Sequence, residues 1–111
     1  MHHPTAIIDP NSKIDEGVDI GPYSIIGPDV EIGSESVIES HVILKGPTKM
    51  GKRNHVFQFS TIGDGSPDKK YNNEPTNLVI GNDNIIREGV TIHRGTIQDS
   101  GTTILGDRNL M

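Results

Sequence analysis

The side chains of this sequence that could do chemistry are mainly histidines. The chain has five His and no Cys, which excludes a thiol nucleophile, a disulfide and a cysteine metal site. Histidine titrates near neutral pH and therefore suits general acid–base catalysis. From the residues alone, His93 is interpreted as an exposed side chain with no chemical role. His41 and His55 could in principle share a metal ion, but we favour the interpretation that both are exposed side chains without a ligand.

A second group of candidates lies in a polar stretch from residue 64 to about 77. Asp68 carries a carboxylate that can accept hydrogen bonds from vicinal hydroxyls. Lys70 carries a cation that can pair with a substrate phosphate. The alternatives, a solvated loop Asp and an exposed loop Lys, remain open at the level of these residues.

The composition limits what kind of protein must position these side chains. Hydrophobic residues make up 32% of 111 residues, with 13 Gly and 7 Pro, enough for one domain but poor in material for a globular core. The net charge of −5 argues against non-specific nucleic-acid binding. The apolar runs are too short for a membrane span, and no secretory signal precedes them. We therefore expect a cytoplasmic protein.

The apolar residues recur every six positions, and this repeat predicts the fold. Ten consecutive positions of this frame are aliphatic or Met, namely Ile8, Ile14, Ile20, Ile26, Ile32, Ile38, Leu44, Met50, Val56 and Ile62. Small or modest side chains recur four residues after them, as at Ser12, Val18 and Ser24, and Gly often follows the apolar residue directly. A period of six fits neither an α-helix nor a long strand. It fits very short strands separated by corners.

Stacking such units would place the apolar column inside a solenoid, so that little hydrophobic material is enough. Two residues of a strand that are two apart, such as Ser12 and Ile14, point to the same face. Glycine at many corners is expected to supply backbone conformations that a Cβ would penalise. If three units make one coil, residues 8 to 61 supply three coils.

The repeat is interrupted twice. After Gly63 the next two positions in frame are Asp68 and Glu74, which cannot lie in a core, and the repeat resumes at Ile80. We therefore predict a polar loop from 64 to about 77, leaving one corner of a regular coil. A shorter break covers residues 98–103, after which Leu105 restarts the frame one residue late. Such loops often carry binding residues, although a tolerated insertion remains open.

The six-residue unit resembles the hexapeptide-repeat family, whose units read aliphatic-Gly-x-x-small-x. The resemblance implies an all-β fold, a left-handed parallel β-helix of triangular section. The hand comes from the resemblance alone, because general rules favour right-handed crossovers. Residues 1–111 are then one incomplete hexapeptide-repeat domain.

More specific motifs resemble the acyl-carrier-protein–UDP-N-acetylglucosamine O-acyltransferase family, along essentially the whole chain. They lie at residues 3–7, 20–23, 58–59, 67–71, 74–76 and 86–96. The D-x-K-Y loop, E-P-T and R-E-x-V-T-I-H-R-G-T are far more specific than the hexapeptides. The resemblance implies transfer of a β-hydroxyacyl group from acyl carrier protein to the 3-hydroxyl of UDP-N-acetylglucosamine, the first step of lipid A biosynthesis.

The resemblance also assigns partners and site residues. Asp68 would contact the sugar, and His93 would line a cleft between subunits of a homotrimer. No metal and no cofactor is implied, because phosphopantetheine arrives on acyl carrier protein. Pro67 replaces a residue that is often Gln in the family, which removes any contact made by that amide. The basic group Lys45, Lys49, Lys52 and Arg53 either meets acyl carrier protein or is a solvated face.

In the family the general base is a histidine in a stretch like N-A-H-x-x-H-D, which would follow Met111. No catalytic residue is therefore assigned within the chain, which is expected to be a fragment and inactive by itself. One alternative is a non-enzymatic hexapeptide solenoid that acts as an assembly module. Another is a zinc-dependent γ-class carbonic anhydrase relative, for which only His93 is suitably placed.

Overall fold

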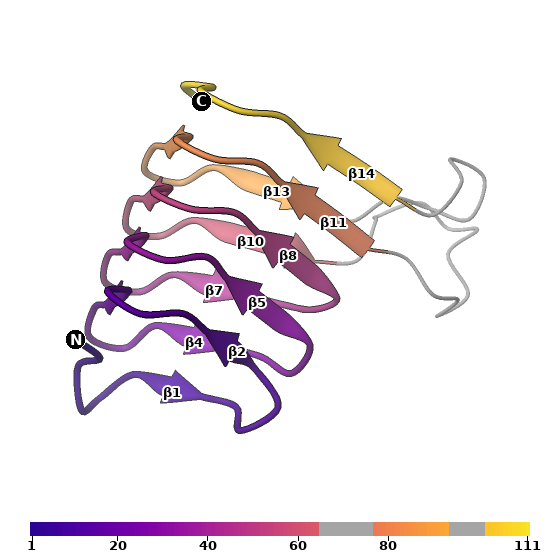
Figure 1. Ribbon diagram of the computed structural model, residues 1–111. Coiled ribbons are helices and arrows are strands. Elements are labelled where there is room, and N and C mark those ends of the chain that lie inside the picture. The colour runs from indigo at the N-terminus through magenta and orange to yellow at the C-terminus, as the bar shows by residue number, and fades with distance from the viewer. Residues whose placement is uncertain (65–76, 94–101) are drawn as a thin grey trace.

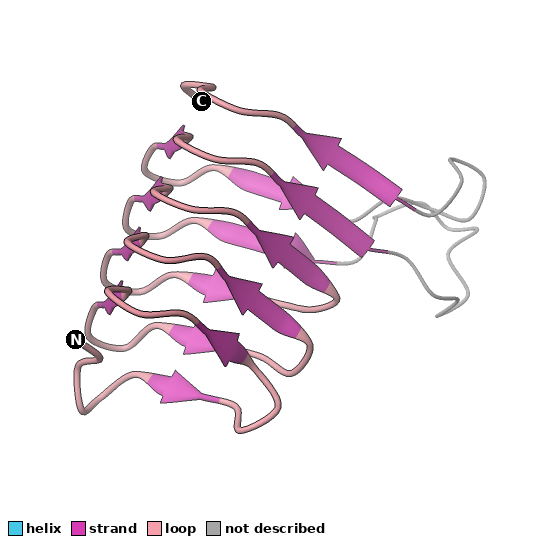
Figure 2. Cartoon of the chain, in the orientation of Figure 1, coloured by secondary structure: helices cyan, strands magenta, loops and turns pink. Residues whose placement is uncertain are grey.

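The computed structural model describes residues 1–64, 77–93 and 102–111. This part of the chain contains strands and turns, wound into stacked coils (Figures 1 and 2). None of the described residues belongs to a helix long and apolar enough to cross a membrane.

The strands form three parallel sheets, one along each side of the coil. The first sheet contains β1 (Ile7–Ile8), β4 (Ile25–Ile26), β7 (Ile43–Leu44), β10 (Thr61–Asp64) and β13 (Thr91–His93). The second contains β2 (Lys13–Ile14), β5 (Val30–Ile32), β8 (Thr48–Met50), β11 (Asn77–Ile80) and β14 (Thr102–Leu105). The third contains β3 (Asp19–Ile20), β6 (Val37–Ile38), β9 (His55–Val56) and β12 (Ile85–Ile86).

The strand register fixes the length of a coil. Ile7 pairs with Ile25, Ile25 with Ile43 and Ile43 with Thr61, so one coil takes 18 residues and contains three repeats, as predicted. In Figure 1 the chain runs rightward along the more distant first sheet, returns leftward along the nearer second sheet, and rises toward the C-terminus. That winding is left-handed, which confirms the hand implied by the resemblance.

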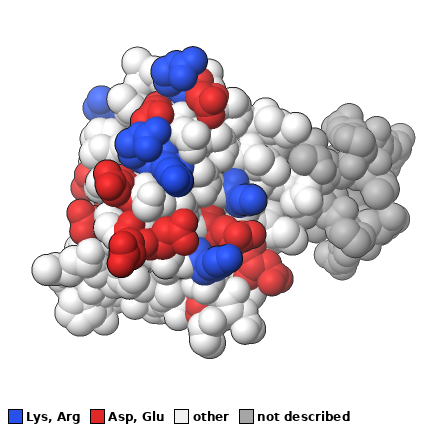
Figure 3. Space-filling view, viewed as in Figure 1, with Lys and Arg blue, Asp and Glu red and all other residues white. Residues whose placement is uncertain are grey.

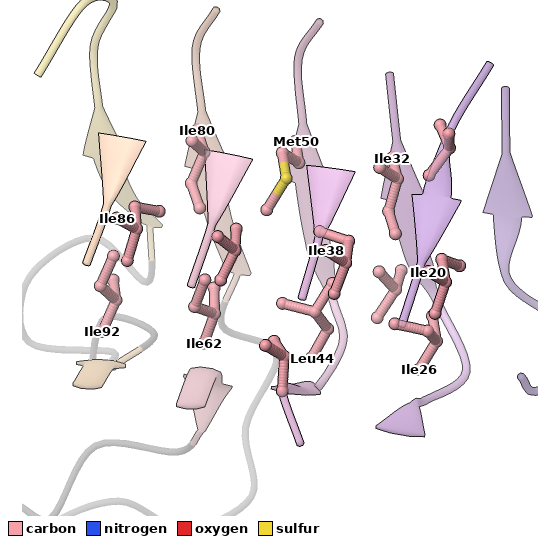
Figure 4. Packing of buried hydrophobic residues seen from close by; sticks show 14 of the residues in the cluster. Ile20, Ile26, Ile32, Ile38, Leu44, Met50, Ile62, Ile80, Ile86 and Ile92 are labelled. Atoms are coloured by element: carbon pink, nitrogen blue, oxygen red, sulfur yellow. The ribbon is translucent and has the colours of Figure 1, made fainter. Parts of the chain in front are cut away.

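The predicted apolar column is the core. From Ile20 to Ile62 every residue of the frame is at most 2% exposed. Figure 4 shows the labelled side chains of this column pointing into the coil. Ile8 and Ile14 are only partly buried and pack against this cluster. They belong to the first coil, which has a coil on one side only. Burial of each such side chain contributes about 1.5–3 kcal/mol to the stability of the fold. The repeated side chains together therefore take the place of a globular core.

A second inward column is polar, and its hydrogen bonds run from coil to coil. The Oγ of Ser36 accepts from the backbone N of Asn54 at 3.2 Å, and Oδ1 of Asn54 accepts from the N of Asn84 at 2.9 Å. The Nδ2 of Asn54 donates to the Gly81 carbonyl at 2.8 Å, and Oδ1 of Asn84 accepts from the N of Asn109. These bonds satisfy side chains that would be costly to bury unpaired.

The reason predicted for the repeated glycines is wrong. Of the glycines that follow an inward residue, Gly63 alone among the described ones has a positive φ. At Gly33 an added Cβ would lie 2.5 Å from the carbonyl carbon of Gly51 on the next coil. At Gly21 it would lie 2.7 Å from the carbonyl carbon of Glu39. These glycines therefore permit close approach of successive coils, not an unusual backbone conformation.

The left-handed backbone falls two residues later in most repeats, chiefly on residues other than glycine. Eight such residues have φ between 55° and 64°, namely Tyr23, Asp29, Glu35, His41, Arg53, Phe59, Asp83 and Arg108. Each lies at a corner, three residues after an inward side chain. Stacked backbone hydrogen bonds hold these corners, for example from Arg53 N to the Ser34 carbonyl. The pairing of coils offsets the cost of a left-handed conformation there.

Both interruptions leave the same corner, the one between the first and second sheets. Thr61 pairs with Thr91 and Leu78 with Thr103, offsets of 30 and 25 residues instead of 18. Residues 65–76 and 94–101 lie outside the described part of the chain. Leu105 pairs with Ile80 and is half-buried, whereas Ile104 is 74% exposed. The late restart of the frame at Leu105 is therefore confirmed.

Candidate functional site

The candidate site lies at the corner where β10 and β13 end, side by side in the first sheet (Figure 1). His93 is the last residue of β13 and is exposed. It follows the inward Ile92, which is 9% exposed, and so points outward as the sequence predicted. The described chain stops at His93 and resumes at Thr102. His93 thus lies at the start of one of the two interruptions.

A bulge at Gly63 changes which residue lies beside His93. Ile62 pairs with Ile92, but the next pair is Asp64 with His93, because Gly63 is an extra residue on the lower strand. Gly63 has a φ of 86°, and a Cβ there would collide with the Lys45 carbonyl and with Oγ1 of Thr48. Glycine is therefore required at this position both for its backbone conformation and for space.

Asp64 forms an ion pair with the coil below it. Lys45 Nζ lies 3.3 Å from Asp64 Oδ1, and both side chains are about half exposed. Thr48 Oγ1 donates to the Lys45 carbonyl at 2.5 Å and so fixes the backbone of that coil. Lys45, Asp64 and His93 therefore occupy three successive coils at the same corner. A cation, a carboxylate and an imidazole follow one another there.

Two of the predicted site residues, Asp68 and Lys70, lie outside the described residues, and their roles stay predictions. The segment that holds them begins after Asp64 and ends before Asn77. Both of these flanking residues lie at the corner that His93 also occupies. His93 and both flanking residues of that segment therefore lie at one corner of the coil.

Two other histidines, His41 and His55, are held in ring stacks at other places. His41 lies between Tyr23 and Phe59 at the corner of the third and first sheets, with ring centroids 5.3 Å apart on each side. His55 stacks on Phe57 at 4.2 Å, and its Nε2 lies 2.6 Å from a carboxylate oxygen of Glu39. The two rings belong to different stacks, and these contacts give each a packing role.

Within residues 1–64, 77–93 and 102–111, no group of three or more His, Asp and Glu side chains is placed to hold a metal ion. The prediction that the protein needs no metal remains a prediction.

Figure 3 shows Lys and Arg side chains interspersed with Asp and Glu side chains on one face. Three of the four basic residues suggested as a partner surface have an acidic neighbour. Lys45 pairs with Asp64, and Arg53 donates two hydrogen bonds to Asp83, at 2.7 and 3.0 Å. Lys49 lies beside Glu31 on the second sheet. Arg53 holds the pKa of Asp83 below its ordinary value, chiefly through these hydrogen bonds. The arrangement therefore favours a solvated face of mixed charge.

Sequence reasoning missed one residue of the corner, Asp64. The repeat predicts this residue only as the start of a polar loop. The repeat frame gave no sign that Gly63 is a bulge, because Gly at that position looks like any other repeat glycine. One signal in the sequence could have indicated Asp64. It is a charged residue that directly follows a repeat glycine and directly precedes the interruption of the repeat.

The fold defines a class of protein, the left-handed parallel β-helix built from hexapeptide repeats. A family model described as "GMPPB C-terminal domain" matches residues 2–102. The chain belongs to that family.

The relatives of high identity carry the name that the motifs suggested. The chain is 60% identical over 109 residues, 98% of its length, to the acyl-[acyl-carrier-protein]–UDP-N-acetylglucosamine O-acyltransferase of Saccharophagus degradans. It is 64% identical over 97% of its length to the enzyme of that name from Pseudomonas entomophila. The resemblance to these acyltransferases is therefore confirmed.

Solved structures give the same result. LpxA from Acinetobacter baumannii superposes with a TM-score of 0.97 at 50% identity, over 98% of this chain and 42% of that one. The UDP-N-acetylglucosamine acyltransferase of Francisella novicida superposes with a TM-score of 0.97 at 38% identity, over 100% of this chain and 41% of that one. The chain spans 42% of the length of the curated relatives it matches and corresponds to their N-terminal part.

Proposed function

We propose that this chain forms the N-terminal coils of an acyltransferase that moves a β-hydroxyacyl group from acyl carrier protein to UDP-N-acetylglucosamine. The observation that carries the proposal is the match of almost the whole chain to enzymes of that name, at 60–64% identity. The coincidence of both interruptions at one corner, beside His93, supports a site there. The product would be the 3-O-acylated sugar nucleotide of lipid A biosynthesis.

The proposed reaction is an acyl transfer from sulfur to oxygen. A general base takes the proton of the sugar 3-hydroxyl, and the oxygen attacks the thioester carbonyl. The carbon–sulfur bond breaks, and the phosphopantetheine thiol leaves with a proton. In the family the base is a histidine of a later coil, so none of the five histidines of this chain is assigned that role.

The residues of this chain are proposed to bind and orient the sugar nucleotide. Asp68 accepts hydrogen bonds from sugar hydroxyls, and Lys70 pairs with the diphosphate. His93 faces the substrate from the end of β13, where it is exposed. Holding the hydroxyl near the thioester lowers the entropic part of the barrier.

The proposal extends to the assembly. The protein acts in the cytoplasm as a homotrimer, with the cleft between subunits completing the site. It needs no metal and no cofactor other than the phosphopantetheine of acyl carrier protein. Transfer that persists at an undiminished rate in EDTA supports the metal-free part, and loss of transfer that added metal restores would contradict it.

An acyl-transfer assay on the complete gene product tests the proposal. Purified protein is incubated with β-hydroxyacyl carrier protein and UDP-N-acetylglucosamine, and the acylated sugar nucleotide is measured. We expect turnover, and we expect Asp68→Ala to lower kcat/KM for the sugar nucleotide by about tenfold or more without lowering stability. Lys70→Ala should mainly raise KM. Lys49→Ala, an exposed lysine of the second sheet, is the matched control.

The outcomes separate the proposal from its alternative. Absence of any acyl transfer by a folded, complete protein would favour the non-enzymatic assembly module. Turnover with unchanged kinetics in Asp68→Ala would keep the activity but reduce Asp68 to a loop carboxylate.

A further inference from the structure

We infer that Asp64 is a positioning residue for His93, holding its imidazole in one orientation and one tautomer. The inference rests on the proposed function for its consequence in catalysis, and on the register of β10 and β13, which makes Asp64 and His93 neighbours, for the structural part. Asp64 lies outside the sequence motifs that resemble the acyltransferase family, so it is an additional residue of the site.

The bulge at Gly63 is the first argument. In a regular strand, residue 64 would share the inward face with Ile62, because side chains alternate. The extra residue turns Asp64 outward and makes it the ladder partner of His93. Neighbouring parallel strands lie about 4.8 Å apart, so a carboxylate and an imidazole on such a pair are close enough for a change of rotamer to bring them together. Bulges commonly re-aim a side chain next to an active site.

The ion pair with Lys45 is the second argument. Lys45 Nζ lies 3.3 Å from Oδ1 of Asp64, on the side away from His93, since Lys45 belongs to the coil below. The contact draws one carboxylate oxygen of Asp64 toward the coil below. A carboxylate has a second oxygen and further lone pairs, so it can accept from an imidazole at the same time.

The chemistry of a carboxylate beside a histidine is the third argument. A neutral imidazole donates from one ring nitrogen and accepts at the other, and its neighbour decides which. A carboxylate that accepts from one nitrogen leaves the other with its lone pair toward the substrate. His93 would then accept a hydrogen bond from the sugar nucleotide in a fixed direction. This is how partner groups orient functional histidines in general.

Two readouts on the complete gene product test the inference. The first is the 15N spectrum of histidine-labelled protein at about pH 8.5, where a free imidazole is neutral, with His93 assigned from its absence in His93→Gln. We expect one tautomer in the parent and a mixture in Asp64→Asn. The second is kinetics, where Asp64→Asn should lower kcat about tenfold or more and change KM by less than about twofold.

Lys45→Met is the matched control. It breaks the same ion pair but keeps the carboxylate beside His93, so the single tautomer should persist and kcat should fall less than in Asp64→Asn. Equal effects of the two variants on both readouts would overturn the inference, because the ion pair alone would then matter. A change in only one readout of Asp64→Asn, in an active enzyme, would overturn it as well. If the parent transfers no acyl group, the proposed function fails and the tautomer alone decides the inference.

Discussion

Two corners of this β-helix are built by the same repeat, but one is continuous and the other is interrupted. The corner between the second and third sheets is continuous along the described coils. Its left-handed residues stack as an alternating charge column, Glu35, Arg53, Asp83 and Arg108. The corner between the first and second sheets is interrupted on two successive coils, and there Asp64 and His93 lie side by side.

The difference shows how a solenoid can be interrupted at one corner without losing its register. The Asn54–Asn84 hydrogen bond and the Arg53–Asp83 pair span 30 residues of sequence, across the longer coil, yet each joins adjacent coils at regular places. The continuous sides therefore hold the coils in register, while one corner accommodates additional chain. Loops on a rigid scaffold are where binding residues are usually found.

The largest effect is expected from a charge in the apolar column. Ile26→Asp should abolish folding, because Ile26 is 1% exposed and an unpaired carboxylate would replace a core side chain, a change costing more than about 4 kcal/mol. Ile25→Asp is the control, because Ile25, the neighbour of Ile26 in the same strand, points outward and is 40% exposed. Urea denaturation followed by circular dichroism measures both. An Ile26→Asp protein as stable as its parent would contradict the inward assignment.

Alanine substitutions at three glycines should separate space from backbone conformation. Gly33→Ala should cost about 3 kcal/mol, because its Cβ would overlap the backbone of Gly51. Gly89→Ala should cost only about 1 kcal/mol, since Gly89 has a φ of 70° but no atom within 4 Å of the added Cβ. Gly106→Ala, with neither constraint, should be nearly neutral. Thermal unfolding gives the order, and a Gly89 variant less stable than the Gly33 variant would reverse this explanation.

The polar column inside the coil should be sensitive to loss of a single amide. Asn54→Ala leaves the Gly81 carbonyl and the backbone N of Asn84 without their partners, which should cost about 2 kcal/mol. Asn11→Ala, at an exposed corner, is the control and should change stability little. The free energy of unfolding in urea is the measurement. A cost for Asn54→Ala no larger than for Asn11→Ala would mean that water replaces the lost bonds.

The smallest effect is expected at the continuous charged corner, and it should depend on pH. Arg53 lowers the pKa of Asp83 in the folded protein, so the pair stabilises the fold above the ordinary pKa of an aspartate, about 4. That contribution is lost as the pH falls through the lowered pKa of Asp83. Asp83→Asn should therefore be slightly less stable than the parent at pH 7, and the two should converge at low pH. A difference that grows on acidification would contradict this sign.

The sequence was sufficient to predict the fold because the repeat is a local signal that recurs in every coil. Ile20 to Ile62 could be assigned inward from spacing alone, and Leu105 could be assigned as the late restart. The left hand could not be derived in this way, because six-residue spacing is the same for either winding. The purpose of Gly33 could not be derived either, since close approach depends on which residue of the next coil lies above it.

The site was less predictable, because it depends on contacts between coils. The exposure of His93 followed from its place after Ile92, but the pairing of Asp64 with His93 depends on a single bulge that shifts the register. Asp68 and Lys70 were suggested by their motif and lie outside the described residues. The structure shows at which corner the segment that holds them begins and ends. The sequence alone gives only the order of these residues along the chain.

The interrupted corner is tested most directly by comparing two histidines in the complete gene product. His93 lies at that corner, and His41 is also exposed but lies at the corner between the third and first sheets. We expect His93→Ala to lower kcat/KM for acyl transfer to the sugar nucleotide by about tenfold or more, with unchanged stability in urea. His41→Ala should retain the kcat/KM of the parent. Equal kcat/KM values for both variants would contradict the placement of the site at the interrupted corner.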